Sequence, residues 1–163
     1  MGYMKEEKII VFLNDLKKNL INYEEQYGDE FEIYFDDSLV RYGSKIANLE
    51  TMLYDCEKAE DAFYTADCSL AEFYDDPYLD VYISCEGSVY EDVYGYSAYG
   101  GDDHKKDLYD AFDDAAEANG LTMDFCDGAL AFQSDESWEK QIEDNLIERK
   151  RIEEELRRKM EEI

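Results

Sequence analysis

The sequence predicts an α+β fold: an antiparallel β-sheet with packed helices and a long C-terminal helix. Apolar residues recur at three- and four-residue steps in some segments and alternate with polar residues in others, and an Asp127-Gly128 pair joins two alternating segments. With 163 residues, 45% of them apolar, the chain is long enough to bury a core. We expect an acidic α+β domain over residues 1–136 and a charge-balanced helix over residues 137–163.

The first half of the chain predicts a helix, a strand and a second helix. The first helix covers residues 5–27 and is followed by Gly28 as a stop. Its apolar positions at helical spacing are Ile9, Phe12, Leu13, Leu16, Leu20 and Tyr27. A strand is expected over residues 31–35, where apolar and polar side chains alternate. The second helix, over residues 44–61, is predicted from the helical spacing of Ile46, Leu49, Leu53 and Cys56.

The second half predicts two hairpins with a helix between them. The first hairpin pairs a strand over residues 78–84 with one over residues 88–96, with Gly87 between them. The third helix has an apolar face and ends at Asn119-Gly120, a pair suited to a left-handed stop. That face consists of Leu108, Ala111, Phe112 and Ala115. The second hairpin joins strands over residues 121–126 and 129–133 through the Asp127-Gly128 turn.

The final helix is predicted to start at a Ser134 cap and to run to Ile163. Residues 148–163 contain six bases and six acids, and acid-first pairs four residues apart, such as Glu153 with Arg157, stabilise a helix. An apolar stripe follows it: Trp138, Ile142, Leu146, Ile152, Leu156, Met160 and Ile163. The stripe suits a helix packed along its own domain, or one that projects and forms a homodimer or docks on a partner.

The charge of the chain is unusual. Sixteen Lys and Arg oppose 43 Asp and Glu, which gives a formal charge of −27, although a magnitude of about 2 to 8 keeps a small domain soluble. Residues 22–138 contain 31 acids and five bases and so carry −26 of this charge. Residues 59–104 contain no Lys or Arg at all, but they hold twelve acids and eight tyrosines.

The base-free stretch predicts a surface that binds a basic partner. We expect alternation on the strands to turn Tyr78, Asp80 and Tyr82 outward, opposite Leu79, Val81 and Ile83. The full candidate set is Asp75, Asp76, Tyr78, Asp80, Tyr82, Glu91, Asp92, Tyr94, Asp102 and Asp103. Carboxylates on such a face would form a row of fixed negative charges, and tyrosine rings offer flat surface on which Arg can stack. The alternative is that the acids are solvated and the tyrosines form edges of the core.

Residues for catalysis or metal binding are sparse. The single histidine, His104, excludes two-histidine metal motifs, and no glycine-rich nucleotide loop occurs. The aspartate doublets do not fit a calcium-binding loop, so we expect no metal, no cofactor and no enzyme activity. We expect the four widely spaced cysteines to be reduced thiols: Cys56, Cys68, Cys85 and Cys126. The N-terminus lacks the order of a signal peptide, and no apolar run approaches the ~20 residues of a membrane span, so we expect a cytoplasmic protein.

In composition, residues 22–138 resemble the acidic nucleic-acid-mimicking inhibitors of phages and mobile elements, the anti-restriction and anti-CRISPR type. The resemblance comprises small size, acidity, abundant Asp, Glu and Tyr, and the lack of a catalytic motif, and it includes no shared sequence motif. It implies a non-catalytic inhibitor that evades host defence in the host cytoplasm. Such an inhibitor occludes a basic nucleic-acid-binding protein, for example a nuclease, without binding nucleic acid or membrane itself.

Two other function classes fit the same composition. One is an immunity protein or acidic chaperone that masks a basic toxin or effector. The other is an ordinary domain of a halophile, acidic for solubility, which predicts acids spread evenly over the surface.

Overall fold

The computed structural model describes residues 2–28, 35, 38–65, 76–84, 88–126 and 128–162. In chain order the elements are α1 (Glu6–Tyr27), β1 (Leu39–Tyr42), β2 (Lys45–Asn48), α2 (Leu49–Tyr54), a 3₁₀ turn η1 (Ala59–Ala62), β3 (Tyr64–Thr65), β4 (Val81–Ser84), α3 (Ser88–Tyr99), α4 (Asp103–Ala118), β5 (Leu121–Cys126), β6 (Ala129–Ser134) and α5 (Asp135–Glu161). The α+β class and the long C-terminal helix are therefore confirmed.

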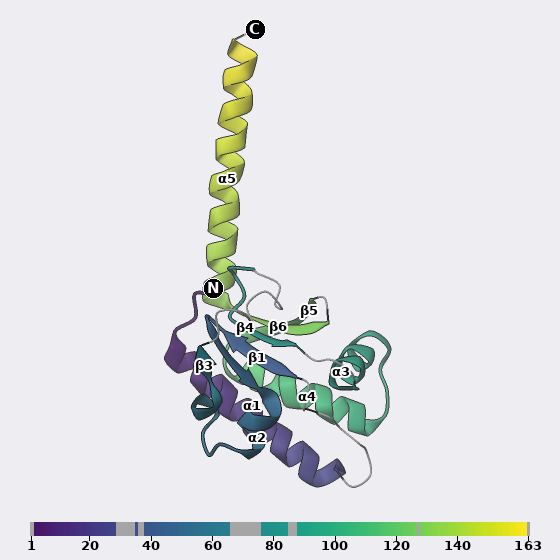
Figure 1. Cartoon of the computed structure of the whole chain (residues 1–163). Coiled ribbons are helices and arrows are strands. Elements are labelled where there is room, and N and C mark those ends of the chain that lie inside the picture. Colours follow the sequence, from purple (N-terminus) through teal and green to yellow (C-terminus); the bar gives the residue numbers. More distant parts are fainter. Residues whose placement is uncertain are drawn as a thin grey trace.

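The strands form one antiparallel sheet in the order β3-β2-β1-β4-β6-β5 (Figure 1). One face of the sheet packs on the helices. Side chains that alternate along the three central strands enter this core: Val40, Tyr42, Val81, Ile83, Leu130 and Phe132. The main core therefore lies between the sheet and the helical layer.

Helix α4 is the middle helix of that layer, with α1 on one side and α3 on the other. Leu108, Phe112 and Ala115 of α4 are buried, as are Phe12 and Leu16 of α1. The rings of Phe12 and Phe132 approach with centroids 5.0 Å apart, so α1 is joined directly to the sheet. The side of α4 that faces away from the sheet is left to solvent.

Several sequence predictions are confirmed. Helices α1 and α4 form where the apolar spacing predicts them, and β5 and β6 pair as the expected hairpin. Gly128 has a φ of 83°, the left-handed conformation that a glycine adopts freely in a tight turn. The Ser134 hydroxyl accepts a hydrogen bond from the N–H of Ser137 and caps α5 as predicted.

The predicted strand over residues 88–96 is wrong, because this segment forms helix α3. Both edges of β4 are occupied, by β1 and by β6, so no edge remains to which a hairpin partner could bond. Val89 and Val93 lie one helical turn apart and are both buried. Aromatic and β-branched residues favour strands only where they have cross-strand neighbours to pack against, and here they pack as a helix. Gly87 lies outside the described residues.

The predicted helix over residues 44–61 is wrong at its start and its end, and only Leu49–Tyr54 of it forms an α-helix. Instead β1 and β2 form a hairpin through Gly43, whose φ is 57°, and the short helix α2 follows, capped by Asn48. Ile46 is buried on the sheet face opposite the main core, so its helical spacing to Leu49 was coincidental. The strand expected over residues 31–35 lies outside the described residues except for Phe35, which is buried.

The predicted strand over residues 78–84 is shorter than expected, since β4 begins at Val81. Cys56 and Cys126, the two cysteines among the described residues, are half-buried. None of the helices in the described part of the chain combines the length and the hydropathy that a bilayer span needs.

Helix α5 projects from the body of the protein (Figure 1). Its 27 residues make a rod about 40 Å long. Ser137 is its one buried residue among those described, and every residue from 145 to 162 is exposed.

Candidate protein-binding surface

The strand pattern predicted that Asp80 faces solvent, but Asp80 is buried. Its side chain is 2% exposed and accepts three hydrogen bonds: from the N–H of Met4 at 2.9 Å, from the N–H of Ser134 at 2.7 Å, and from the hydroxyl of Ser137 at 2.8 Å. The chain before α1 and the start of α5 cover this end of the sheet. Asp80 therefore joins three distant segments, and it is a structural residue.

Tyr82 is also buried, at 3% exposure. It packs with Ile46, Leu39 and Leu79 in a small cluster on the sheet face opposite the main core. Its hydroxyl accepts a hydrogen bond from the N–H of Asp76 at 3.1 Å, and burial raises its pKa to about 12. The prediction that Tyr82 faces outward is wrong, because both faces of β4 are covered.

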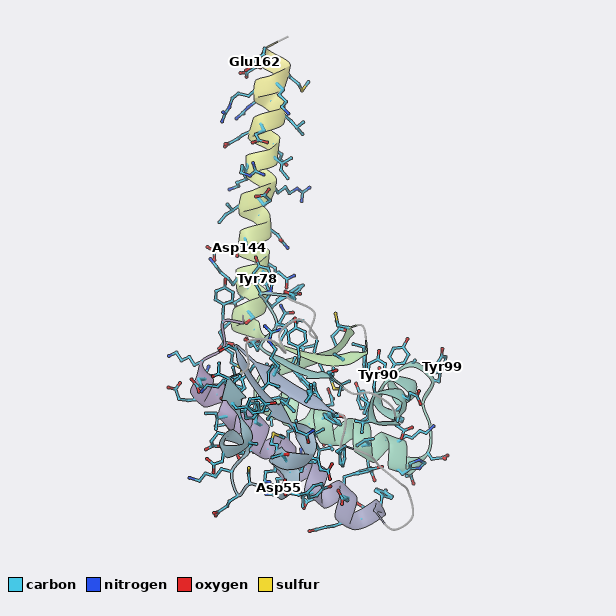
Figure 2. The ribbon with its side chains drawn as sticks, viewed as in Figure 1. Asp55, Tyr78, Tyr90, Tyr99, Asp144 and Glu162 are labelled. Carbon is cyan, nitrogen blue, oxygen red and sulfur yellow. The ribbon has the colours of Figure 1, made fainter. Side chains whose placement is uncertain are left out.

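Tyr78 and Asp76 belong to the turn before β4. The Tyr78 hydroxyl points toward Asp144 of α5 (Figure 2) and donates to its Oδ2 at 2.9 Å. The Tyr78 ring stacks on that of Tyr3. The carboxylate of Asp76 accepts from the N–H of Tyr78 at 2.9 Å. Tyr78 therefore holds the base of α5, and Asp76 holds the turn that contains Tyr78. Asp75 lies outside the described residues.

The remaining candidates gather around α3 and the start of α4. Tyr94 is 43% exposed and stacks on Tyr90, with ring centroids 5.7 Å apart and planes 8° from parallel. Phe125 of β5 meets both rings edge-on. Glu91 is exposed beside this stack, and Tyr99 at the end of α3 is 87% exposed (Figure 2). These residues form an aromatic and acidic surface.

The other three candidates are Asp92 of α3 and Asp102 and Asp103 at the start of α4. Asp102 and Asp103 are exposed at the start of α4. Asp92 is half-buried, and burial raises its pKa, while the nearby charges of Lys105 and His104 oppose that rise. His104 is thus placed next to a carboxylate of the surface.

A further feature of this surface was missed in the sequence. Five carboxylates follow one another along α4 at steps of four, three, four and three residues: Asp103, Asp107, Asp110, Asp114 and Glu117. We call them the α4 acidic row. At 100° per residue they fall within about 80° of the helix circumference and span about 21 Å. The signal was present, because these acids recur at helical spacing on a different side of the helix from the predicted apolar face.

A groove of about 250 Å³ runs beside the row, between α4 and α1. It is lined by Asn19, Asn22, Tyr23, Gln26, Asp107, Asp110, Ala111 and Asp114. At its edge the Tyr27 hydroxyl donates to Oδ2 of Asp107. Burial raises the pKa of Tyr23 to about 12, with the nearby charge of Asp92 as a further cause. The groove therefore combines carboxylates with uncharged hydrogen-bonding groups.

Lys106 lies near two members of the row, Asp107 and Asp110. Among the described residues, the ion pair that reaches the row joins Lys106 to Asp110 at 2.6 Å. Beside the row, burial raises the pKa of Asp113, and the charges of Glu117, Asp114 and Asp110 raise it further. The carboxylates thus repel one another in the free protein, and a basic partner would relieve that repulsion.

Asp113, Asp114 and Glu117 place their carboxylate oxygens within 4.8 Å of one another. Oxygen ligands of this kind suit Mg²⁺ or Ca²⁺, but two of the three residues are exposed, and exposed acidic groups are common without a bound ion. The arrangement is better suited to the guanidinium groups of a protein partner, which bind carboxylates in a bidentate manner.

No protein-family model matches the chain, and neither the curated proteins nor the solved structures give a match.

Proposed function

We propose that this protein is a non-catalytic inhibitor that binds the basic nucleic-acid-binding surface of a nucleic-acid-processing protein and blocks it. The observation that carries the proposal is the α4 acidic row, five carboxylates at regular helical intervals on one helix face, of which Asp103, Asp114 and Glu117 are exposed and Asp107 and Asp110 are half-buried. This surface replaces the β4 strand face that the sequence pattern suggested.

The spacing of the row suits this role. Steps of three and four residues place successive carboxylates about 5 Å apart along the helix axis. A DNA strand places one phosphate per ~3.4 Å of its axis, so the charge density along the row is of the same order. Basic side chains that follow a nucleic-acid strand would meet negative groups at comparable intervals on α4.

Tyrosines of α3, the helix that packs against α4, offer contacts of a second type. Tyr94 and Tyr99 of α3 expose ring surface, and Glu91 of the same helix is exposed as well. Arg guanidinium groups stack on tyrosine faces while they pair with carboxylates. A nucleic-acid-binding groove is rich in Arg and Lys, so it offers both kinds of partner group. Nucleic acid itself is repelled by the row.

The test compares two variants with the same change in net charge. Asp103→Lys/Asp114→Lys/Glu117→Lys alters the row at three exposed positions. The control, Asp55→Lys/Glu57→Lys/Asp61→Lys, alters three exposed carboxylates around α2 and η1, on the other side of α1. Each immobilised protein is used to capture proteins from the nucleic-acid-binding fraction of a nuclease-treated host lysate, and bound proteins are eluted with salt or with duplex DNA.

We expect the parent and the control to capture a basic protein that DNA displaces, and the row variant to lose it. Equal capture by both variants would refute a specific role for the row and favour acidity as a solubility device. A captured partner that DNA fails to displace would favour the immunity-protein or chaperone alternative.

A further inference from the structure

Helix α5 exposes large apolar side chains from its first turn to its last. Trp138, Ile142, Leu146, Ile152, Leu156 and Met160 are all more than two-fifths exposed. At 100° per residue they fall within about 120° of the helix circumference, which makes one stripe.

This stripe is turned away from the contacts that hold α5 to the body. Ser137, Gln141 and Asp144 make those contacts, through Asp80, Gln133 and Tyr78. Their mean direction around the helix lies about 120° from that of the stripe. The body therefore cannot cover the stripe without releasing these hydrogen bonds.

The charges flanking the stripe are arranged in blocks. A basic block, Arg149 to Arg151, is followed by an acidic block, Glu153 to Glu155, a second basic block, Arg157 to Lys159, and a second acidic pair, Glu161 and Glu162. Within one helix these blocks form ion pairs, such as Arg151 with Glu155 at 3.0 Å. The same blocks set the direction in which two such helices can pair.

We propose that the tips of α5 from two copies of this chain pair in an antiparallel manner around Leu156. In that register Leu156 meets its own copy, and Ile152 meets the partner's Met160. The acidic block of each chain then lies beside the second basic block of the other, so that Glu153 faces the partner's Arg157 and Glu155 faces the partner's Lys159. The first basic block similarly lies beside the partner's Glu161 and Glu162.

Parallel pairing is disfavoured by two electrostatic terms. It places each block beside the same block of the partner, and like charges at that distance repel. It also brings together two bodies whose residues 22–138 carry −26 each. The antiparallel register separates the first turns of the two α5 helices, where each helix joins its body, by about 57 Å. This distance is several times the Debye length of ~10 Å at 0.1 M salt.

The contact is small, with three apolar side chains per chain at its centre, so we expect a weak dimer that forms as concentration rises. Sedimentation velocity of the full-length protein, from micromolar to millimolar concentration, measures this equilibrium. Ile152→Gln/Leu156→Gln/Met160→Gln should abolish the dimer. Ile147→Gln is the matched control, because Ile147 is 58% exposed on the opposite side of α5. A parent that stays monomeric at millimolar concentration, or a control that loses the dimer equally, would overturn the proposal.

A mixing experiment separates pairing between chains from ion pairs within one helix. Glu153→Lys/Glu155→Lys and Arg157→Glu/Lys159→Glu should each be monomeric, because each places like charges opposite one another. Mixed together, they should form a heterodimer, since each chain then meets opposite charge in its partner. Mixing cannot repair pairs within a single helix, so the absence of a heterodimer between variants that remain helical by circular dichroism would refute the antiparallel register.

Discussion

Asp80, which precedes β4, accepts a 2.8 Å hydrogen bond from the hydroxyl of Ser137 in the first turn of α5, 57 residues later in the chain. The same carboxylate accepts from the N–H groups of Met4 and Ser134. One buried side chain thus fixes the N-terminal segment, the end of β6 and the base of the projecting helix.

Asp80→Asn should destabilise the protein by about 2 kcal/mol or more, because hydrogen bonds to a charged group contribute about 1.5–3 kcal/mol each and an amide nitrogen cannot accept from these donors. Urea unfolding followed by circular dichroism measures the change. Asp114→Asn, at an exposed position, is the control and should leave stability within about 0.5 kcal/mol. Equal stability of the two variants would contradict the structural role of Asp80.

Tyr78→Phe should raise the pKa of Asp144. The hydrogen bond from the Tyr78 hydroxyl is the main cause that lowers this pKa, and Lys140 lowers it further, so the pKa should return part of the way to its ordinary value. An NMR titration of the side-chain carboxyl resonances measures it. Tyr3→Phe keeps the ring that stacks on Tyr78 and should leave the Asp144 titration unchanged.

Asp113→Asn should stabilise the protein at neutral pH by about 0.5 kcal/mol, the size of like-charge contacts on a helix. Because burial and neighbouring carboxylates raise the pKa of Asp113 in the folded state, the folded protein binds this proton more tightly than the unfolded chain. The contribution of Asp113 to the stability of the parent protein therefore falls as the pH rises from the ordinary carboxyl pKa through the raised pKa. The difference in stability between the variant and the parent should therefore be smaller at a pH below this range of pKa values. A variant less stable than the parent at pH 7 would contradict this account.

Asn48→Ala should cost about 1 kcal/mol, because the Asn48 side chain caps α2 by accepting from the N–H of Thr51 at 3.2 Å. Asn48→Ser should restore most of the loss, since a serine hydroxyl can accept the same hydrogen bond. Thermal unfolding of the three proteins gives the comparison. A Ser variant as unstable as the Ala variant would show that the cap is not the cause.

Local patterns in the sequence determined the elements whose neighbours in space are also neighbours in the chain. The β5–β6 hairpin follows from alternation around a tight turn, and α4 follows from the spacing of Leu108, Phe112 and Ala115. The cap at Ser134 was predictable for the same reason, because its hydrogen bond reaches only three residues along the chain. The acidity of residues 22–138 needed no structure at all.

Tertiary structure alone decided which surfaces the charged and aromatic residues occupy. Residues 88–96 became helical because β1 and β6 take both edges of β4, a competition between segments far apart in sequence. Alternation placed Asp80 and Tyr82 opposite the main core, but it could not show that the N-terminal segment and α5 cover Asp80 or that Ile46 packs on Tyr82. The α4 acidic row could be read from the sequence as helical spacing. Its role as a surface depends on the packing of α4 between α1 and α3, which leaves only its outer face to solvent.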